Sequence, residues 1–338
     1  MDRYTLNRRT LLKGATAASA AALVTQFPRP AHAAYPERTI KVVIPTRQGG
    51  GAERLARAFT DAWRQSLGQP FEFEFYPGGA GQVGYEIFTG KRDKDAYNLL
   101  FGNMGPEMIM YALQKVKYKF PEDYFYFCRI DIDDSCLIVR KDSPFKRIED
   151  VVAEGKKRVL NVGTSRLPHP ASIGVLALGD ATGAKFNLVP YGGGNPTVVA
   201  TLNGEVDCTV LPMTEPIRLA DKVRILTVFA DENALAEKSG NAPPVNKVFG
   251  TKIPELYSSR AFAIHTAAAD KHPDAFKKLN EGAKKVFDDP GFKTAFEKLG
   301  GTWEAVKYGD REVCTKYALA MVDLANRYRP LLTAKKKK

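Results

Sequence analysis

The chain contains few of the residues that most often hold metals or act as acids, bases and nucleophiles. It has four histidines and four cysteines among 338 residues, and no cysteine stands in a CxxC pair. The spacing therefore spells neither a zinc site nor a thioredoxin-like redox motif, and we expect no metal and no cofactor. The four cysteines are predicted to be buried free thiols: Cys128, Cys136, Cys208 and Cys314.

Catalytic and nucleotide-binding motifs are missing as well. No serine stands in GxSxG, no HExxH occurs, and no loop spells GxxxxGK[ST]. Residues 78–84 look like a dinucleotide fingerprint, but they follow the second predicted strand and open a short helix. His169 lies between Pro168 and Pro170, where a structural role is expected. The sequence therefore predicts a protein that is not an enzyme.

Long hydrophobic runs are also absent, since no stretch approaches the ~20 apolar residues that span a bilayer. The N-terminus carries Arg8-Arg9, a mildly apolar run from Gly14 to Val24, and the small-x-small pattern Ala31-His32-Ala33. A twin arginine ahead of a weakly hydrophobic stretch is typical of a twin-arginine export signal. We predict that residues 1–33 are a signal peptide and that the mature protein is periplasmic.

The basic excess becomes small once the two ends are set aside. The whole chain has 50 basic and 38 acidic residues, a net charge of +12. Without residues 1–33 the charge is +8, and without the terminal run 335–338 it is +4. No basic patch with interleaved aromatics indicates nucleic acid, so we expect none as partner. A mildly positive body favours an anionic ligand through its long-range field.

Strand and helix patterns alternate from residue 39 onward. Thr39–Pro45 is a short apolar strand, Ala52–Leu67 has one apolar helical face, and Phe71–Phe75 alternates at period two. This order predicts an α/β fold with mostly parallel sheets flanked by helices. The same order restarts in the middle of the chain, and helical segments follow Pro273. We therefore predict two lobes and a helical C-terminal part.

The chain is predicted to cross between the lobes twice. Lobe 1 comprises residues 34–132 and 229–338, and lobe 2 comprises residues 133–228. The crossings are placed near Ile130–Asp134 and Leu226–Ala230, and we expect the lobes to close by hinge motion there.

Glycine-rich or polar loops recur where predicted strands end. Ligands of open α/β sheets bind at the carboxyl ends of the strands, and a helix N-terminus offers unpaired N–H donors to an anion. A single loop of this kind is more often a tight turn. Five of them at one edge argue for a site that suits carboxylate or phosphate: residues 46–51, 78–81, 103–106, 163–166 and 192–194.

One arginine stands in the first loop of each half. Arg47 or Arg166 can hold a carboxylate with two parallel hydrogen bonds. A surface arginine with its stem along apolar surface is an equal alternative for each. Glu53, in the first turn of the first helix, can simply complement the helix dipole.

Several of these segments together resemble one family. The similarity runs from about Tyr35 to Pro330, and the combination of motifs is specific although each is weak. The chain resembles the substrate-binding proteins of tripartite tricarboxylate transporters, the Bug or TctC family, in Tyr35–Ile40 leading to Gly49-Gly50-Gly51, Pro77–Gly84, Asp95–Leu100, Pro190–Gly194, Gly204–Asp207, Asp288–Phe292 and Leu299-Gly300-Gly301.

The resemblance implies a type 2 periplasmic binding fold whose two lobes close over a ligand. In the family, the loop after the first strand of each lobe holds a ligand carboxylate, partly through water. Carried onto this chain, the resemblance and the loop positions predict these ligand-binding residues: Thr46, Arg47, Gln48, Gly49, Gly50, Gly79, Ala80, Asn103, Gly163, Thr164, Ser165, Arg166, Tyr191, Gly192, Gly193 and Asp207.

Two departures from the family pattern fall in these loops. Ala52-Glu53 stands where the family often has Thr-Asp, and Ser165-Arg166 stands where a Gly-Ser pair is usual. Our hypothesis is that Arg166 meets a second acidic group of a dicarboxylate.

The expected function is that of a periplasmic solute-binding protein. It would capture a small organic carboxylate, either a dicarboxylate or an aromatic one, for the membrane permease subunits of a tripartite tricarboxylate-type transporter. A monomer is expected. One alternative is a periplasmic ligand sensor for a membrane receptor, and another is an enzyme on the same two-lobe scaffold.

Overall fold

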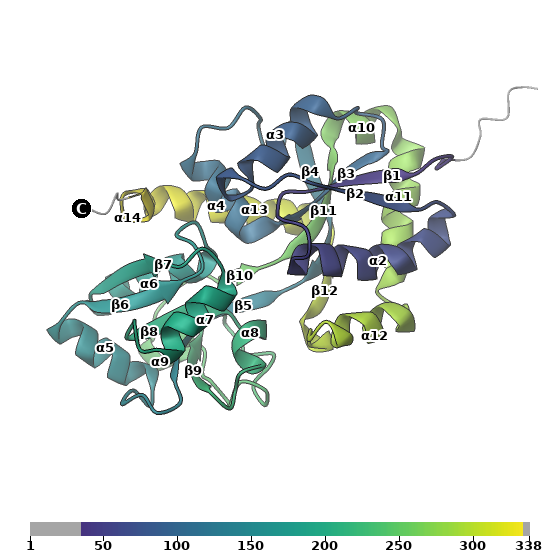
Figure 1. Cartoon of the computed structure of the whole chain (residues 1–338). Coiled ribbons are helices and arrows are strands. Elements are labelled where there is room, and N and C mark those ends of the chain that lie inside the picture. Colours follow the sequence, from purple (N-terminus) through teal and green to yellow (C-terminus); the bar gives the residue numbers. More distant parts are fainter. Residues whose placement is uncertain (1–34, 334–338) are drawn as a thin grey trace, which may run out of the picture. The chain divides into compact units, whose positions relative to one another are not determined.

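The computed structural model describes residues 35–333 (Figure 1). The predicted signal peptide, residues 1–33, and the lysines at 335–338 lie outside the described residues. The residues from Arg38 onward form one compact unit, which contains both sheets. Within the described residues, no helix combines the length and the apolar character that a membrane span requires.

Lobe 1 is built on a six-stranded sheet with the order β12-β4-β11-β3-β1-β2. Its strands are β1 (Ile40–Ile44), β2 (Phe71–Phe75), β3 (Asn98–Asn103), β4 (Tyr124–Asp131), β11 (Arg260–His265) and β12 (Val306–Gly309). Its helices are α2 (Gly51–Leu67), α3 (Gln82–Lys91), α4 (Met104–Leu113), α10 (Thr266–Lys271), α11 (Pro273–Val286), α12 (Pro290–Lys298), α13 (Arg311–Arg327) and α14 (Arg329–Thr333).

Lobe 2 is built on a second sheet with the order β10-β5-β8-β6-β7, in which β9 also pairs with β5. Its strands are β5 (Asp133–Arg140), β6 (Leu160–Thr164), β7 (Phe186–Pro190), β8 (Cys208–Pro212), β9 (Val223–Val228) and β10 (Tyr257–Ser258). The helices around it are α5 (Ile148–Lys157), α6 (Pro170–Thr182), α7 (Gly194–Leu202), α8 (Thr214–Ile217) and α9 (Val245–Phe249).

The predicted fold class is confirmed, with one difference in the sheets. Each sheet is mixed: β1 pairs in parallel with β2 and β3, and β6 pairs in parallel with β7 and β8, whereas the remaining pairings are antiparallel. The antiparallel strands β4 and β5 come from the segment that connects the lobes, where no glycine loop and helix separate successive strands. The pattern of strand, loop and helix therefore identified only the parallel part of each sheet.

Burial follows the expected faces. In α2 the buried side chains include Leu55, Phe59 and Trp63, and Gly68 ends the helix at φ 74° in the left-handed region that glycine adopts without strain. All eight residues of β4 are buried, because the strand is interior to the sheet and helices α11 and α13 pack against it. The four cysteines are free and buried, as predicted.

The two sheets are connected by two short segments. Only Ile132 separates β4 from β5, and the chain returns through β10, which pairs with β5 before β11 enters the first sheet. Ala230, Leu235 and Ala242 pack in one core cluster with Cys136 of β5. We therefore propose that lobe 2 continues to about residue 258, whereas the sequence had placed its end at residue 228.

Candidate functional site

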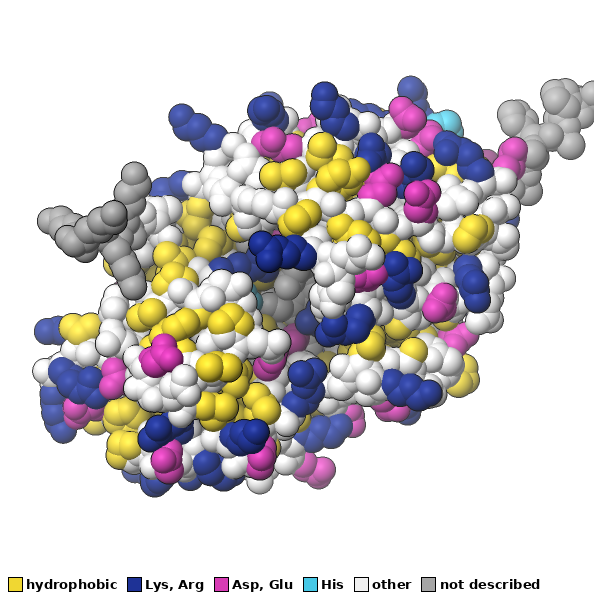
Figure 2. All heavy atoms as spheres, in the orientation of Figure 1, with side chains coloured by type: hydrophobic (Ala, Val, Ile, Leu, Met, Phe, Trp, Pro, Cys, Tyr) yellow, Lys and Arg dark blue, Asp and Glu magenta, His cyan; other side chains and the backbone are white. Residues whose placement is uncertain are grey.

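A cleft of about 610 Å³ is lined by residues from both lobes. It lies where the parallel strands β1, β3 and β6 end, which is the position expected for a ligand in α/β sheets. Figure 2 shows basic side chains around the hollow in the middle of the view. The predicted residues that line this cleft are Thr46, Ala80, Asn103, Ser165, Arg166, Gly192 and Gly193.

The first loop of lobe 1 is held by the first turn of α2. Gly49 has φ 80°, and its N–H donates to Glu53 Oε2 at 2.5 Å, while Arg54 Nη1 donates to the Gly49 carbonyl at 2.8 Å. The bond from Gly49 and a second one from Arg57 hold the pKa of Glu53 below its usual range. Glu53 therefore fixes this loop rather than merely complementing the helix dipole.

This loop turns most of its predicted residues away from the cleft. Arg47, Gln48 and Gly49 are exposed, and none of them lines the cleft; Gly50, the N-cap of α2, does not line it either. Thr46 does, and its buried Oγ1 has no hydrogen-bond partner among the described residues. The arginine that the sequence placed here, Arg47, is thus replaced at the cleft by Arg54, one turn into the helix.

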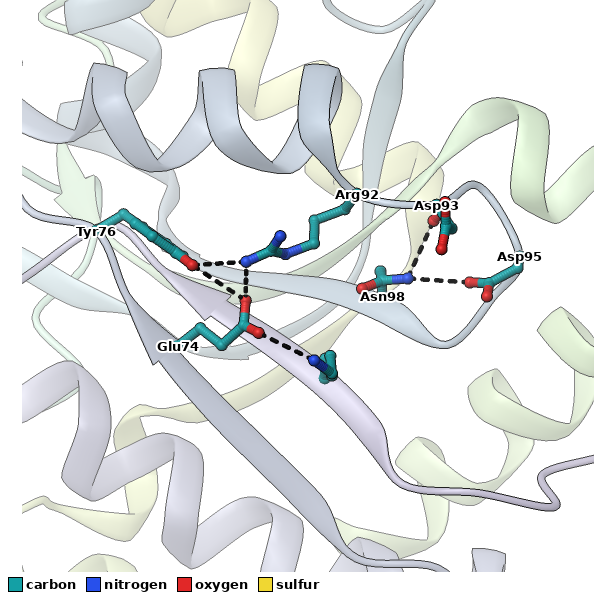
Figure 3. Close-up of polar contacts among 7 residues, drawn as sticks. Glu74, Tyr76, Arg92, Asp93, Asp95 and Asn98 are labelled. Carbon is teal, nitrogen blue, oxygen red and sulfur yellow. Dashed lines mark hydrogen bonds and ion pairs between the residues drawn. The ribbon is translucent and has the colours of Figure 1, made fainter.

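The second glycine loop is anchored by an ionic network at the edge of the sheet (Figure 3). Arg92, just after α3, forms an ion pair with Glu74 of β2 and donates to Tyr76 Oη at 2.6 Å. Lys41 Nζ of β1 donates to the same carboxylate at 3.3 Å. Tyr76 stands immediately before residues 77–81, so the network fixes the start of this loop.

The residues of this loop adopt an unusual backbone conformation. Gly78, Gly79, Ala80 and Gly81 all have positive φ, between 56° and 130°. Three of the four are glycine, which adopts such angles without strain, whereas Ala80 at φ 57° accepts a steric cost. Ala80 lines the cleft and Gly79 does not. The turn therefore presents the side with Ala80 to the ligand space.

Asn103 ends β3 and is the N-cap of α4 at the floor of the cleft. Its backbone N–H donates to Glu107 Oε2 at 2.6 Å, and its side-chain Oδ1 is buried without a partner among the described residues. Tyr85 donates a second hydrogen bond to Glu107 Oε2 at 2.7 Å. Burial is the largest influence on Glu107 and raises the pKa of its carboxyl group to about 7.

In lobe 2, the loop after β6 directs one arginine into the cleft. Thr164 and Ser172 donate to the carbonyl oxygen of Arg166 at 3.2 and 3.0 Å, and the two hydroxyls lie 2.8 Å apart. Thr164 is therefore a buried support of the loop and not part of the cleft lining. The side chain of Arg166 lines the cleft and forms no ion pair or hydrogen bond with any described residue.

Gly163 has a packing role that sequence reasoning mistook for a ligand contact. A Cβ at this position would lie 2.6 Å from Thr209 Oγ1 and 3.3 Å from Thr197 Cγ2. Glycine is needed here because β6 packs closely against β8 and α7, and the residue does not line the cleft.

Two further predicted residues lie away from the cleft. Asp207 precedes β8 and therefore stands at the amino end of the parallel strands, where its carboxylate accepts from Arg158 and from the Asn161 N–H, both at 2.7 Å. Tyr191 directs its hydroxyl to Glu205 at 3.4 Å. The cleft is at the carboxyl end of these strands, opposite to Asp207, so a motif next to a strand did not show which end it occupies; Tyr191 follows β7 at the carboxyl end but does not line the cleft.

Sequence reasoning missed several charged residues of the cleft. Arg260 begins β11 and forms an ion pair with Asp131 and another, at 3.7 Å, with Asp133. Arg54 and Arg218 also line the cleft, and Glu215 is its second carboxylate beside Asp133. No local signal identified Arg260, because its partners are more than 120 residues away in the sequence. Four arginines against two carboxylates make the lining suitable for an anion.

His169, also missed as a cleft residue, is a neutral structural group. It is the N-cap of α6, and its Nδ1 accepts from the Ala171 N–H at 3.1 Å, which leaves the proton on Nε2, 3.2 Å from Ser258 Oγ. Burial and the nearby charge of Arg166 lower the pKa of His169 to about 3. Both ring nitrogens are thus occupied, which agrees with the expected structural role. Among the described residues, no group of His, Cys, Asp and Glu has the arrangement of a metal site.

Comparison with known proteins gives consistent matches over most of the chain. Residues 55–325 match the family model described as tripartite tricarboxylate transporter family receptor, TctC. Protein BugT of Bordetella pertussis is 25% identical over 79% of this chain and 82% of its own length.

Solved structures show the same fold. MatC from Rhodopseudomonas palustris with bound malate has a TM-score of 0.65 and 20% identity, over 88% of this chain and all of the other. R. palustris Rpa4515 with adipate has a TM-score of 0.72 and 19% identity, over 88% and 98%. The mixed sheets, the cleft between them and the match over residues 55–325 lead to one assignment: this chain belongs to the TctC family of tripartite tricarboxylate transporter receptors.

Proposed function

We propose that this chain is a periplasmic solute-binding protein that captures a small organic carboxylate in the cleft between its lobes and delivers it to the permease subunits of a tripartite tricarboxylate-type transporter. The observation that carries the proposal is Arg166, a cleft guanidinium without an ion-pair partner among the described residues. Guanidinium groups bind carboxylates through charge-assisted hydrogen bonds, commonly in pairs.

The rest of the cleft supports a ligand that is both anionic and polar. Thr46 offers a hydroxyl donor without a partner, and Asn103 Oδ1 is an unused acceptor for a ligand hydroxyl or a water molecule. Leu55, Leu211 and Phe296 add apolar surface for a short carbon chain. Two fold relatives are described with malate and adipate, which are dicarboxylates of this size.

We propose that the ligand is held by closure of the two lobes. The hinge comprises the two crossing segments, residues 131–133 and 258–260, because these carry the chain between the sheets. The expected ligand-contacting residues are those predicted residues that line the cleft, together with Arg54, Arg218 and Arg260. His169, the histidine in the lining of the cleft, is occupied at both ring nitrogens, and we propose binding without turnover.

A thermal-shift screen of the purified protein tests the binding proposal. The panel contains monocarboxylates, dicarboxylates, aromatic carboxylates, phosphate and sugars, because a ligand that binds the native state raises the melting temperature. We expect the largest rise with a carboxylate, and mass spectrometry of the incubated ligand should find it unchanged. Stabilisation by phosphate or a sugar alone would contradict the proposal, and conversion of the ligand would indicate an enzyme.

The export proposal rests on residues 1–33 and has its own test. Replacing Arg8 and Arg9 with lysine should leave the uncleaved precursor in the cytoplasm, as fractionation and immunoblotting would show. Unchanged periplasmic recovery of the double variant would contradict a twin-arginine signal.

A further inference from the structure

The first turns of α4 in lobe 1 and α6 in lobe 2 are in direct contact. A Cβ at Gly105 of α4 would lie 2.9 Å from Cγ of Pro170, the first residue of α6. Figure 1 shows α4 next to α6. Glu107 follows Gly105 by two residues, and Arg166 precedes Pro170 by four. Both charged residues therefore stand close in sequence to this contact between the lobes, and each influences the ionisation of the other.

Glu107 is buried without any structural cation of its own. Its side chain is 1% exposed, and both of its hydrogen bonds, from Tyr85 and from the Asn103 N–H, go to Oε2. Oε1 has no partner among the described residues. A carboxyl group in this setting holds a proton readily, because the charged form gains little from its surroundings.

The other groups around Glu107 do not ionise near neutral pH. Tyr85 of α3, Tyr124 and Tyr126 of β4, and Tyr118 before that strand are buried, and burial raises the pKa of each phenol above its usual range. Tyr317 of α13 donates to the Tyr257 carbonyl, and burial raises its pKa as well.

The loop and the second lobe add no competing group. Gly79–Gly81, which packs against α4, brings no charge, and His169 behind Arg166 stays neutral because its pKa is about 3. Within the described residues, Arg166 is thus the one charged side chain found to act on Glu107.

We propose that Glu107 is a positioning residue that sets the anion affinity of Arg166, and that capture of an anionic ligand at Arg166 takes up one proton from solvent onto Glu107. This inference rests on the proposed function. Ionised Glu107 competes with the ligand for the charge of Arg166, whereas protonated Glu107 leaves that charge to the ligand. The bound anion in turn disfavours a second negative charge behind Arg166, so the proton stays on Glu107 while the ligand is held.

The direction of the pH dependence follows from this linkage. Glu107 has a pKa of about 7 without ligand, and a bound anion raises it further. Affinity therefore increases as the pH falls through about 7. If the pKa with ligand lies at about 9 or higher, the dissociation constant at pH 8 is about tenfold that at pH 6. Carboxylate ligands remain largely ionised over this range and do not produce this slope themselves.

Isothermal titration calorimetry with adipate and with malate tests the proposal on the purified protein. Titrations at pH 6, 7 and 8, each in two buffers of different ionisation enthalpy, give the dissociation constant and the number of protons taken up. We expect uptake of about half a proton at pH 7 and the tenfold weaker binding at pH 8. Glu107→Gln, which stays neutral, should bind at pH 8 within about twofold of its affinity at pH 6. Glu122→Gln, at an exposed position outside the cleft, is the matched control and should keep the wild-type slope.

Each alternative result has a defined meaning. Wild-type protein that binds without proton uptake and with a flat pH profile would overturn the inference while leaving the proposed function intact. A merely structural Glu107 would lower the melting temperature of Glu107→Gln but keep the wild-type slope, which also overturns it. Should Glu107→Gln not fold, the wild-type proton count decides alone. If wild-type protein binds no carboxylate at any pH, the proposed function fails and this inference fails with it.

Discussion

Two arginines of the cleft, one from each lobe, are held in opposite ways. In lobe 1, Arg260 is tied to Asp131 and Asp133, the carboxylates that flank the first crossing between the sheets. In lobe 2, Arg166 has only its backbone fixed, through Thr164 and Ser172, and its guanidinium has no ion pair within the described part of the chain. One arginine therefore serves the hinge, and the other is available to a ligand.

The difference follows from the position of each arginine relative to the segments that cross between the sheets. Arg260 begins β11, immediately after the second crossing, and its own N–H donates to Asp131 at 2.8 Å. The contact thus connects both crossing segments at a place where Asp131 is almost fully buried. A buried carboxylate needs a cation or several donors, because desolvation disfavours its charge. Arg166 forms no ion pair of this kind: the hydroxyls of Thr164 and Ser172 hold its backbone, and Glu107, the buried carboxyl that its charge influences, becomes neutral when it takes up a proton.

Removing the carboxylate at the hinge should have the largest effect. Asp131→Asn leaves Arg260 with only the more distant Asp133, and we expect the free energy of unfolding to fall by about 2–3 kcal/mol, because one partner of a buried pair is lost. Urea unfolding measures the change. Asp142→Asn is the control, since its pair with Arg140 is solvent-exposed and should contribute under about 0.5 kcal/mol. Equal losses of unfolding free energy in the two variants would contradict the stabilising role of the Arg260–Asp131 pair at the hinge.

Removing the available arginine should affect binding and not stability. Arg166→Ala is expected to weaken carboxylate binding about 10- to 100-fold, the effect of losing a charge-assisted hydrogen bond worth about 1.5–3 kcal/mol. The melting temperature without ligand should stay within about 2 °C, since the Arg166 side chain makes no hydrogen bond or ion pair within the described residues and Glu107 can take up a proton when this charge is removed. Arg218→Ala changes an exposed arginine of the same cleft, and we expect it to weaken carboxylate binding by less than about threefold. Titration calorimetry with the panel carboxylate that binds best gives the affinities of the two variants, and thermal unfolding without ligand gives the melting temperature. Unchanged affinity in Arg166→Ala would contradict the assignment of Arg166.

The first loops of the two lobes also differ in how tightly a glycine is packed, and this difference allows a test with a smaller expected effect. Gly49 in lobe 1 has open space where a Cβ would stand, whereas Gly163 in lobe 2 is packed against Thr209. Gly163→Ala should reduce the free energy of unfolding by about 1–2 kcal/mol through overpacking. Gly90→Ala, in α3 with open space and helical φ, should stabilise the protein by about 0.5–1 kcal/mol. A fully stable Gly163→Ala that lost ligand binding would restore the sequence-based interpretation of Gly163 as a ligand contact.

Local sequence patterns were sufficient for the elements that have one buried face. The apolar face of α2 and the alternation in β2 both predicted the observed structure. They were insufficient for β4, whose eight residues are all buried and show no alternation. They also missed Glu107, which lies in the first turns of α4 behind the predicted site residue Asn103.

The residues of the candidate site also separate into those that local patterns identified and those that they did not. Thr46, Ala80 and Arg166 could be chosen because they follow strands in loops that open helices, and such loops meet at one edge of a sheet. Asp207 was misplaced because a motif beside a strand does not reveal at which end of the sheet it stands. Arg260 and Glu107 could not be chosen at all, since their partners come from distant parts of the chain.

By itself the sequence determined the α/β class, the two-lobe organisation and the family, because periodic burial and glycine-rich turns are local properties that reappear as motifs. Only the tertiary structure decided which charges neutralise one another. Ion pairing depends on distances of a few ångströms between residues that the sequence separates widely, and burial sets how strongly each charge needs a partner. That is why Arg260 became part of the hinge, while Arg166 faces the cleft with Glu107 behind it.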